Sequence, residues 1–332
     1  MKKLLNNPER AIEEMTEGIL AAHRDVLRRS ARHPRALVRA ERADGKAAVI
    51  IGGGSGHEPA FLGYVGSGLA DGVALGNFFA SPPPDPIVAA ARDSETGAGI
   101  LLVYGNYSGD VMNFEMAAEL LATEGIPVES LVIADDVGSA IYEERSSRRG
   151  IAGEVLAYKI LGAAADQGYA LSPLVGLGRQ AMENCRSIGV AWTPCTLPTT
   201  GVESFALAEG EMELGIGVHG EPGVQRIAMG SADQIAEITL TTVLDDFPIA
   251  PRRVALLING LGSTSLMELY VYLRAVMARL EKYRIEVGWV RVGELITSQE
   301  MGGCSLTMLD VDDNLLDLLR APCYGLGWRQ GC

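Results

Sequence analysis

The sequence is poor in the features that bind nucleic acid or cross a membrane. Its 28 Lys and Arg are outnumbered by 42 Asp and Glu, which gives a formal net charge of −14. Phosphate neutralisation needs clustered basic side chains, and this chain has no such surplus. No apolar run approaches the roughly 20 residues of a membrane span, and the charged segment after Met1 does not have the pattern of a secretory signal. We therefore expect a cytoplasmic protein that binds neither nucleic acid nor membrane.

Cysteine and histidine are also scarce. The five cysteines are odd in number and lack C-x-x-C spacing, which favours reduced thiols over disulfides or zinc: Cys185, Cys195, Cys304, Cys323 and Cys332. Four histidines argue against a His-rich metal site. We therefore expect no metal site in this chain.

Nucleotide-binding motifs are missing as well. Gly45-Lys46 is followed by Ala47, and no glycine stands five residues before Gly45, so there is no P-loop. His57 occupies the position of the third glycine in a G-x-G-x-x-G fingerprint. We therefore expect no cofactor in this chain.

The length of 332 residues and the hydrophobic fraction of 48% suit two domains, each with its own core. Asn7-Pro8-Glu9 predicts the start of an amphipathic helix. Apolar runs and helical periodicity then alternate. In the first part we predict strands at 47–51, 72–75, 100–104 and 131–133, and helices at 87–93, 111–124, 153–166 and about 173–184. In the second we predict strands at 187–192, 212–218, 254–258, 285–292 and 304–309, and helices at 232–245, 265–281 and 312–320.

This alternation predicts an α/β protein with two α/β domains, residues 1–185 and 186–332, and mixed, largely parallel sheets. In open α/β sheets, ligands bind in loops at the carboxyl ends of strands. Two such loops stand out in the first domain. They are the glycine-rich 52–59, which precedes a helix-like segment, and 105–110, which ends in Asp110. We expect both loops to face one pocket.

The loop 52–59 reads Gly-Gly-Gly-Ser-Gly-His-Glu-Pro. Its glycines permit dihedrals closed to other residues and leave backbone N–H groups open to a polar ligand. The simpler alternative is a tight strand-to-helix turn with a capping His57. His219-Gly220-Glu221-Pro222 echoes the motif after the strand predicted at 212–218. This repetition favours a functional role for both histidines.

A neutral imidazole can act as a nucleophile or a general base near neutral pH, and a carboxylate can orient it or accept a substrate proton. His57, His219 and Asp110 together would suit a small polyol or ketone. Asp110 could instead be only the N-cap of the helix predicted at 111–124. The residues alone leave these alternatives open.

Four stretches, in this order, resemble the K subunit of dihydroxyacetone kinase, and the likeness runs nearly end to end. They are residues 52–59, Asn106 to Asp110 with Asn113-Phe114, Gly215 to Gly223, and Asn259 to Gly262. The resemblance implies two α/β domains in a homodimer. It also implies covalent binding of a short ketose, with the imidazole of His219 adding to the carbonyl as a hemiaminal.

The resemblance assigns the other site residues too. His57 and Asp110 would hydrogen-bond substrate hydroxyls, and either would serve as the base towards the hydroxyl to be phosphorylated. The pocket would be lined by Gly54, Ser55 and Gly56. The phosphoryl group would come from a separate L subunit or domain carrying ATP with magnesium, or a bound ADP recharged by a phosphotransferase-system protein.

Two positions depart from that family. Gly105 stands where it usually has Lys, in the substrate-binding set, and Phe61 stands where it usually has a second His. Each change removes a polar partner of the substrate. We expect the space left at Gly105 to admit a ketose longer than dihydroxyacetone, such as the four-carbon erythrulose. A ketose kinase subunit is the first functional hypothesis, and a ketose-sensing coactivator of the same fold is the second.

Overall fold

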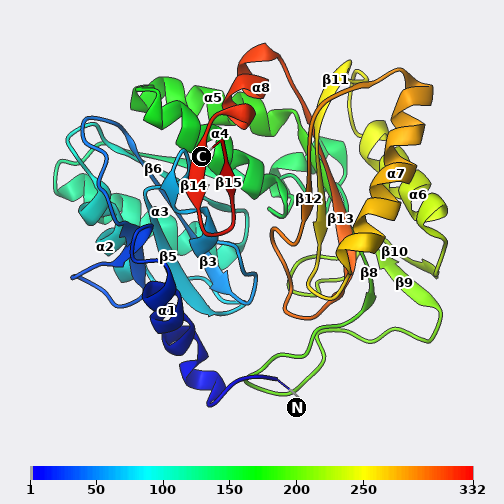
Figure 1. The fold of residues 1–332 in the computed structure, drawn as a ribbon, viewed down its shortest axis with the longest axis horizontal. Coiled ribbons are helices and arrows are strands. Elements are labelled where there is room, and N and C mark those ends of the chain that lie inside the picture. Colours follow the sequence, from blue (N-terminus) through cyan, green and yellow to red (C-terminus); the bar gives the residue numbers. More distant parts are fainter. Residues whose placement is uncertain (1–2, 332) are drawn as a thin grey trace.

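The computed structural model describes residues 3–331, which form a mixed α/β protein around two six-stranded sheets. Figure 1 shows the two sheets side by side, with helices between them and on their outer faces. The chain opens with η1 (Pro8–Arg10) and α1 (Ala11–Ala22), and the Asn7 side chain accepts a hydrogen bond from the Glu9 amide at 3.0 Å. The expected helix start and the α/β fold class are confirmed.

The first sheet has the order β1-β2-β5-β3-β6-β7. Its strands are β1 (Leu27–Arg29), β2 (Ala36–Arg39), β3 (Ala48–Ser55), β5 (Gly72–Phe78), β6 (Ile100–Gly105) and β7 (Val128–Ile133). β5, β3, β6 and β7 are parallel, whereas β1 and β2 join antiparallel. The carboxyl ends of the parallel strands therefore meet at one edge, which is where α/β sheets bind ligands.

Helices cover both faces of this sheet because side chains alternate along each strand. Ile50 packs in the cluster with α2 (Pro84–Ser94) and α3 (Ser108–Thr123). Val49 and Ile51 face the cluster that holds α4 and α5, which span Gly153–Asp166 and Leu171–Glu183.

The second sheet has the order β10-β9-β8-β13-β11-β12. Its strands are β8 (Cys185–Thr193), β9 (Glu211–Leu214), β10 (Gln225–Ala228), β11 (Arg253–Gly260), β12 (Glu286–Gly293) and β13 (Gly302–Asp310). Only β11 and β12 pair in parallel, so the largely parallel pairing that we expected is wrong for this sheet. Antiparallel neighbours need no crossover helix, which explains why only α6 (Ala232–Asp245) and α7 (Leu266–Tyr283) flank its outer face.

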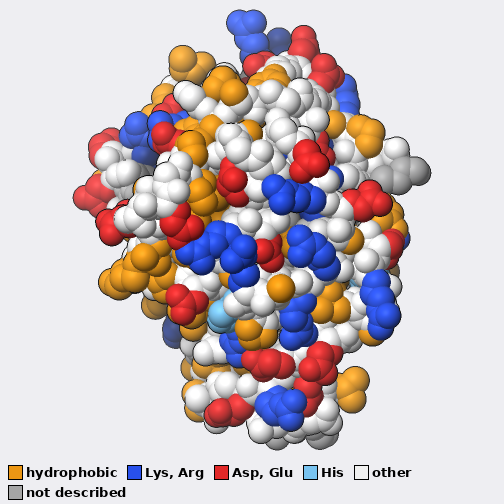
Figure 2. All heavy atoms as spheres, turned by 90° about the vertical axis from the view of Figure 1, so that its left-hand side faces the viewer, with side chains coloured by type: hydrophobic (Ala, Val, Ile, Leu, Met, Phe, Trp, Pro, Cys, Tyr) orange, Lys and Arg blue, Asp and Glu red, His pale blue; other side chains and the backbone are white. Residues whose placement is uncertain are grey.

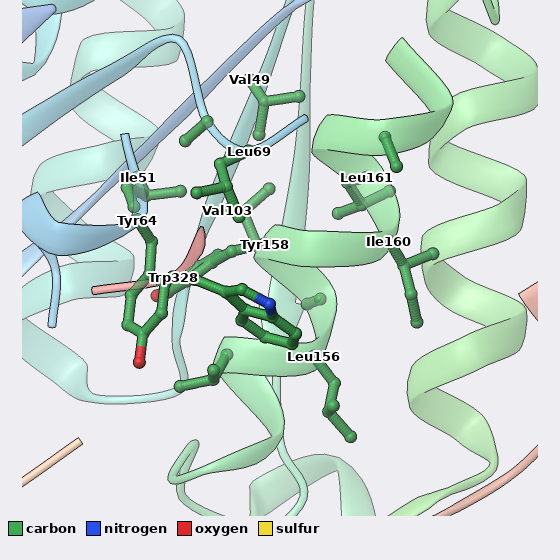
Figure 3. Packing of buried hydrophobic residues seen from close by; sticks show 14 of the residues in the cluster. Val49, Ile51, Tyr64, Leu69, Val103, Leu156, Tyr158, Ile160, Leu161 and Trp328 are labelled. Carbon is green, nitrogen blue, oxygen red and sulfur yellow. The ribbon is translucent and has the colours of Figure 1, made fainter. Parts of the chain in front are cut away.

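The layer between the sheets is built on α4, which is buried from Gly153 to Ala165. Ala255 and Leu257 of β11 pack in the same cluster as α4, α5 and α8 (Asp313–Arg320). Figure 3 shows Trp328, which is fully buried, packed against the α4 layer near Tyr158. A core helix with almost no exposed face thus joins the two halves.

The C-terminal segment returns to the first half of the chain. β14 (Cys323–Gly325) pairs with β4 (Gly66–Ser67), which lies just after η2 (Leu62–Tyr64), and with β15 (Arg329–Gln330). The division into residues 1–185 and 186–332 stays a prediction.

The remaining features of the fold are its surface charges and its cysteines. Figure 2 shows acidic and basic side chains interspersed on the face that it presents. Within residues 3–331 no helix is long and apolar enough to cross a membrane. Cys185, Cys195 and Cys304 are buried free thiols, Cys323 is also buried, and Cys332 lies outside the described residues.

Candidate functional site

The glycine run belongs mostly to a strand. β3 continues to Ser55, so Gly52, Gly53 and Gly54 are strand residues and the loop begins at Gly56. A Cβ on Gly53 would lie 2.3 Å from the Phe61 ring, and one on Gly54 would lie 2.6 Å from the Ala80 amide. The first three glycines thus allow close packing, and only Gly56, with φ of 106°, needs the left-handed region.

The polar groups of the loop already form hydrogen bonds within the protein. The Gly56 amide donates to the carboxylate of Glu58, 3.1 Å from either oxygen, so it is not the open amide that we expected. The Ser55 hydroxyl donates to the Gly76 carbonyl at 2.9 Å. Burial raises the pKa of Glu58. That Gly54, Ser55 and Gly56 line a substrate pocket stays a prediction.

His57 is buried and is held from the second half of the chain. Its Nδ1 lies 2.7 Å from the Thr297 carbonyl oxygen, which can only accept. Nδ1 therefore carries the proton, and Nε2 keeps its lone pair. Burial lowers the pKa of His57 to about 3, so the ring is neutral at physiological pH. Asn259 fixes this contact, because its Oδ1 accepts from the amides of Leu295 and Ile296 at 2.8 and 3.0 Å.

His219 lies in the loop after β9 and is paired with Glu221. Its backbone amide donates to Glu221 Oε2 at 2.9 Å, and its Nδ1 lies 2.8 Å from Glu221 Oε1. The pKa of Glu221 is lowered to about 2 although burial opposes this, because the carboxylate accepts these hydrogen bonds. An ionised carboxylate can only accept, so His219 Nδ1 carries a proton, and in the neutral ring Nε2 holds the lone pair. This is the form of imidazole that can attack a carbonyl.

The two predicted histidines meet. Their ring centroids are 4.9 Å apart, and Phe79 stacks on His57 at 4.8 Å while its edge contact with His219 measures 5.3 Å. Tyr107 meets the His219 ring at 4.8 Å. Phe79 has φ of 53° in the left-handed region, unusual for a bulky residue. Neither aromatic was among the predicted site residues, and the only signal for Phe79 is its place between a strand and the proline run at 82–84.

Asp110 lies in the first turn of α3, whose N-cap residue is Tyr107. The alternative that Asp110 is the N-cap is therefore wrong, because the helix begins earlier than predicted. Its Oδ1 is buried and has no hydrogen-bond partner among the described residues. Burial raises the pKa of Asp110 to about 6, while Ser81 and His219 act in the opposite direction. An unpartnered buried oxygen beside His219 is suited to accept a ligand hydroxyl.

The empty space expected beside Gly105 is not there. A Cβ at Gly105 would lie 2.4 Å from Glu154 Oε1 and 3.2 Å from the Tyr107 ring. Glu154 is buried, accepts a hydrogen bond from the Tyr158 hydroxyl, and has a pKa well above the usual value because of burial. The volume is thus filled by the Glu154 carboxyl group. A direct contact between Gly105 and substrate stays a prediction.

Phe61 is the apolar wall that we expected. Its ring is buried and makes an edge contact with His57 at a centroid distance of 6.2 Å. In the described part of the chain, no cluster of three or more His, Cys, Asp or Glu is placed to hold a metal ion. The site is therefore two imidazoles and one carboxyl group in an aromatic setting.

Comparison with known proteins shows the family of this chain. The Dak1 domain model matches residues 17–326. The chain belongs to the Dak1 family. A relative in Listeria innocua, "PTS-dependent dihydroxyacetone kinase 1, dihydroxyacetone-binding subunit DhaK", is 41% identical over 330 residues, which cover 99% of this chain and 100% of that protein. The family resemblance seen in the sequence is therefore confirmed.

Other Dak1 proteins are longer. The L-erythrulose kinase of Pectobacterium atrosepticum is 41% identical over 337 residues, covering 100% of this chain but 57% of that protein. This Dak1 chain thus spans little more than half the length of that relative. These relatives are kinases or kinase subunits.

Two solved Dak1 structures show what else shares the fold. The C. freundii dihydroxyacetone kinase in complex with AMP-PNP and Mg²⁺ has a TM-score of 0.91 and 32% identity, covering 99% of this chain and 61% of that one. The dihydroxyacetone kinase operon co-activator DhaQ has a TM-score of 0.90 and 35% identity, covering 96% of this chain and 98% of that one. The fold alone therefore does not separate a kinase subunit from a coactivator.

Proposed function

We propose that this chain is the ketose-binding subunit of a dihydroxyacetone-type kinase, with a short ketose of three or four carbons as its substrate. One observation supports this most strongly. The ring centroids of His57 and His219 lie 4.9 Å apart, and the Nδ1 atom of each ring lies within hydrogen-bond distance of an oxygen acceptor, which leaves Nε2 as the nitrogen that can meet a substrate. The names of relatives that act on dihydroxyacetone and L-erythrulose suggest the substrate sizes.

In the proposed capture step, His219 Nε2 attacks the ketose carbonyl carbon. The C–N bond forms as the C=O π pair moves to oxygen, and the proton on Nδ1 passes to Glu221, 2.8 Å away. The new alkoxide takes a proton from water, and the hydroxide that remains takes the proton from Glu221. The carboxylate and the water are thus restored, and the net change is the transfer of one proton from imidazole to the hemiaminal hydroxyl. A low pKa keeps Glu221 ionised, so its carboxylate stabilises the positive charge that the ring gains on attack, before the proton is passed on.

In the proposed transfer step, Asp110 accepts the proton of the terminal hydroxyl. Its buried, unpartnered Oδ1 suits that contact, and a pKa near 6 leaves it mostly ionised at neutral pH. His57 Nε2 would accept a hydrogen bond from a second hydroxyl. The phosphoryl group would come from a partner L-type subunit carrying ATP with Mg²⁺, or bound ADP recharged by a phosphotransferase-system protein. We further propose a homodimer in the cytoplasm, where thiols such as those of Cys185, Cys195 and Cys304 stay reduced.

The experiment is to incubate the purified chain with ketoses of three to five carbons and to measure adducts by intact-protein mass spectrometry after rapid desalting. Phosphorylation is then followed with and without the cognate L-type subunit, ATP and Mg²⁺. We expect an adduct with the chain alone and phosphoryl transfer only with the partner. Turnover of ATP by the chain alone, or no adduct with any ketose, would refute the proposal.

A coactivator is the second candidate, favoured by the close match to DhaQ over nearly its full length. A sensor needs the adduct but no general base. An adduct without phosphoryl transfer, with either the ATP-dependent or the phosphotransferase-dependent L subunit, would favour this role.

A further inference from the structure

The loop that carries His219 is anchored at its base by Arg149, which follows η3 (Tyr142–Ser147) in the other half of the chain. Arg149 Nη2 donates to the Gly215 carbonyl at 2.9 Å. Its Nε and Nη2 lie 2.9 and 2.8 Å from Asp136 Oδ2. One guanidinium group thus joins the segment after β7 to the first residue after β9.

The third nitrogen of the same group lies near Glu221 without forming an ion pair with it. A Cβ on Gly217 would lie 2.7 Å from Arg149 Nη1 and 2.1 Å from Glu221 Oε2. The guanidinium and the carboxylate therefore both border the place that a Cβ on residue 217 would occupy. Only a glycine at this position leaves that place free. Glu221 in turn holds His219 through two hydrogen bonds. Arg149 is one side chain away from the imidazole.

The anchor is buried and closely packed. The Asp136 side chain is fully buried, that of Arg149 is 13% exposed, and Asp136 Oδ1 accepts from the Gly138 amide at 2.9 Å. A Cβ on Gly138 would lie 2.6 Å from Gly215 Cα, so the two backbones touch here. Buried ion pairs add little net stability because desolvation offsets their attraction, but they can fix geometry. Stability alone therefore does not account for this pair.

We infer that Arg149 is a positioning residue for covalent capture, which holds the His219 loop against the rest of the site and keeps positive charge beside Glu221. This inference rests on the proposed hemiaminal at His219. Charge beside Glu221 favours its ionised form, which holds the proton on His219 Nδ1 and leaves Nε2 as the attacking atom. A shift of the loop would also move Nε2 away from the carbonyl, and misplacement of about 1 Å can cost a large factor in rate.

Several other titratable groups face the His219–Glu221 pair. They are Tyr107 and Asp110 of the α3 segment, His57 of the glycine loop, and Asp136 and Glu154 beyond Tyr107. A pH profile reports all of them together. The test therefore compares variants that differ only at the anchor.

The neighbouring Arg148 gives a matched control. It is even more buried, and its Nη1 and Nη2 bind Asp246 at 2.8 and 2.5 Å, so it also joins the two halves. The variants are Arg149→Gln, Arg149→Lys, Arg148→Gln and Arg148→Lys in the full chain. The rate and extent of adduct formation with dihydroxyacetone are measured from pH 5 to 9, together with the thermal midpoint.

For Arg149→Gln we expect adduct formation to be about 10- to 100-fold slower. We also expect its acid limb to move up by about 0.5–1 pH unit, because loss of the nearby cation favours protonated forms of the pair. Arg149→Lys should restore the pH profile better than the rate, since it keeps the charge but not the fork of donors. Both Arg148 variants should lose thermal stability and keep the wild-type pH profile.

The inference is overturned if folded Arg149→Gln has the same pH profile and the same rate of adduct formation as Arg148→Gln. If Arg149→Gln does not fold, Asp136→Asn is used, which keeps the guanidinium and weakens its anchor; an unchanged adduct rate there would also overturn it. Absence of an adduct in the wild type would refute the proposed function and this inference together. An adduct in the wild type with no difference between the Arg149 and Arg148 variants would refute the inference alone.

Discussion

His57 and His219 lie with ring centroids 4.9 Å apart, although they come from loops at the ends of different sheets. Their sequence contexts are alike, because His57 is followed by Glu-Pro and His219 by Gly-Glu-Pro. The two glutamates, Glu58 and Glu221, nevertheless accept hydrogen bonds from different groups. Glu58 accepts from a backbone amide, while Glu221 accepts from the imidazole itself. Only His219 therefore has a carboxylate hydrogen-bonded to its Nδ1, which is the arrangement that the proposed capture step uses.

The first prediction concerns His219→Ala. We expect complete loss of the ketose adduct with little change in thermal stability, because the His219 side chain is 23% exposed in a loop outside the sheets. Intact-protein mass spectrometry after incubation with dihydroxyacetone measures the adduct. His23→Ala, which changes a histidine at the end of α1, is the control and should keep it. An adduct that persists in His219→Ala would assign the covalent bond to another residue.

The second prediction concerns Asp110→Asn. If Asp110 is the general base, phosphorylation should fall by about 10²–10⁴-fold while adduct formation is kept. Burial raises the pKa of Asp110 to about 6, so the wild-type rate should rise with pH through this value as the carboxylate forms, and the variant should lose that limb. The measurement is the pH dependence of phosphoryl transfer with the partner subunit present.

Asp85→Asn is the matched control for Asp110→Asn. Asp85 also lies in the first turn of a helix, α2, and is exposed. It should leave the profile unchanged. Near wild-type turnover in Asp110→Asn would reduce this residue to a structural part of α3.

The sequence predicted the long elements and the proximity of His57 and His219 better than it predicted the hydrogen-bond partners of each residue. The long elements appear within a few residues of their expected bounds, because 8 to 18 residues of periodic pattern leave little ambiguity. Short strands such as β10 and β14 were not predicted, since a strand of 3 or 4 residues has no detectable period. Thr297, which fixes the His57 tautomer, is 240 positions away in the sequence, and only the fold brings it close.

Two errors share one physical cause. The glycines 52–54 were assigned to a ligand-binding loop and Gly105 was interpreted as empty space, because a sequence shows which side chain is missing but not what fills its place. The Phe61 ring lies against Gly53, and the Glu154 carboxyl lies against Gly105. Close approach of a distant residue is a tertiary property, so neither contact could be inferred from local pattern.

The third prediction follows from the filled space at Gly105. Gly105→Ala would place a Cβ 2.4 Å from Glu154 Oε1, so we expect a loss of about 1–3 kcal/mol in the free energy of unfolding. Gly176→Ala in α5 is the control, since a Cβ there meets nothing within 4 Å. Chemical denaturation measures both. The loss should be smaller in a Glu154→Ala background, and a fully additive double mutant would show that Glu154 is not the obstacle.

The last prediction concerns His57 and acid stability. Burial lowers its pKa from 6.5 to about 3 in the folded state, whereas the unfolded chain takes up the proton near 6.5. The unfolded state therefore binds more protons between these values, so stability is full above pH 6.5 and is lost as pH falls towards 3. At about 1.4 kcal/mol per unit, the whole effect is on the order of 4–5 kcal/mol.

His57→Gln removes this titration and keeps an amide that can donate to the Thr297 carbonyl. We expect its unfolding free energy to be lower than that of the wild type at pH 7 and the gap to shrink, and then reverse, as pH falls. Urea denaturation of both proteins at pH values from 7 to 4 gives the difference curve, in which the other titrating groups, such as Glu221 and Asp110, largely cancel. A flat difference curve would mean that His57 is not buried as a neutral ring, and the argument that its Nε2 is free to accept from a substrate would fall with it.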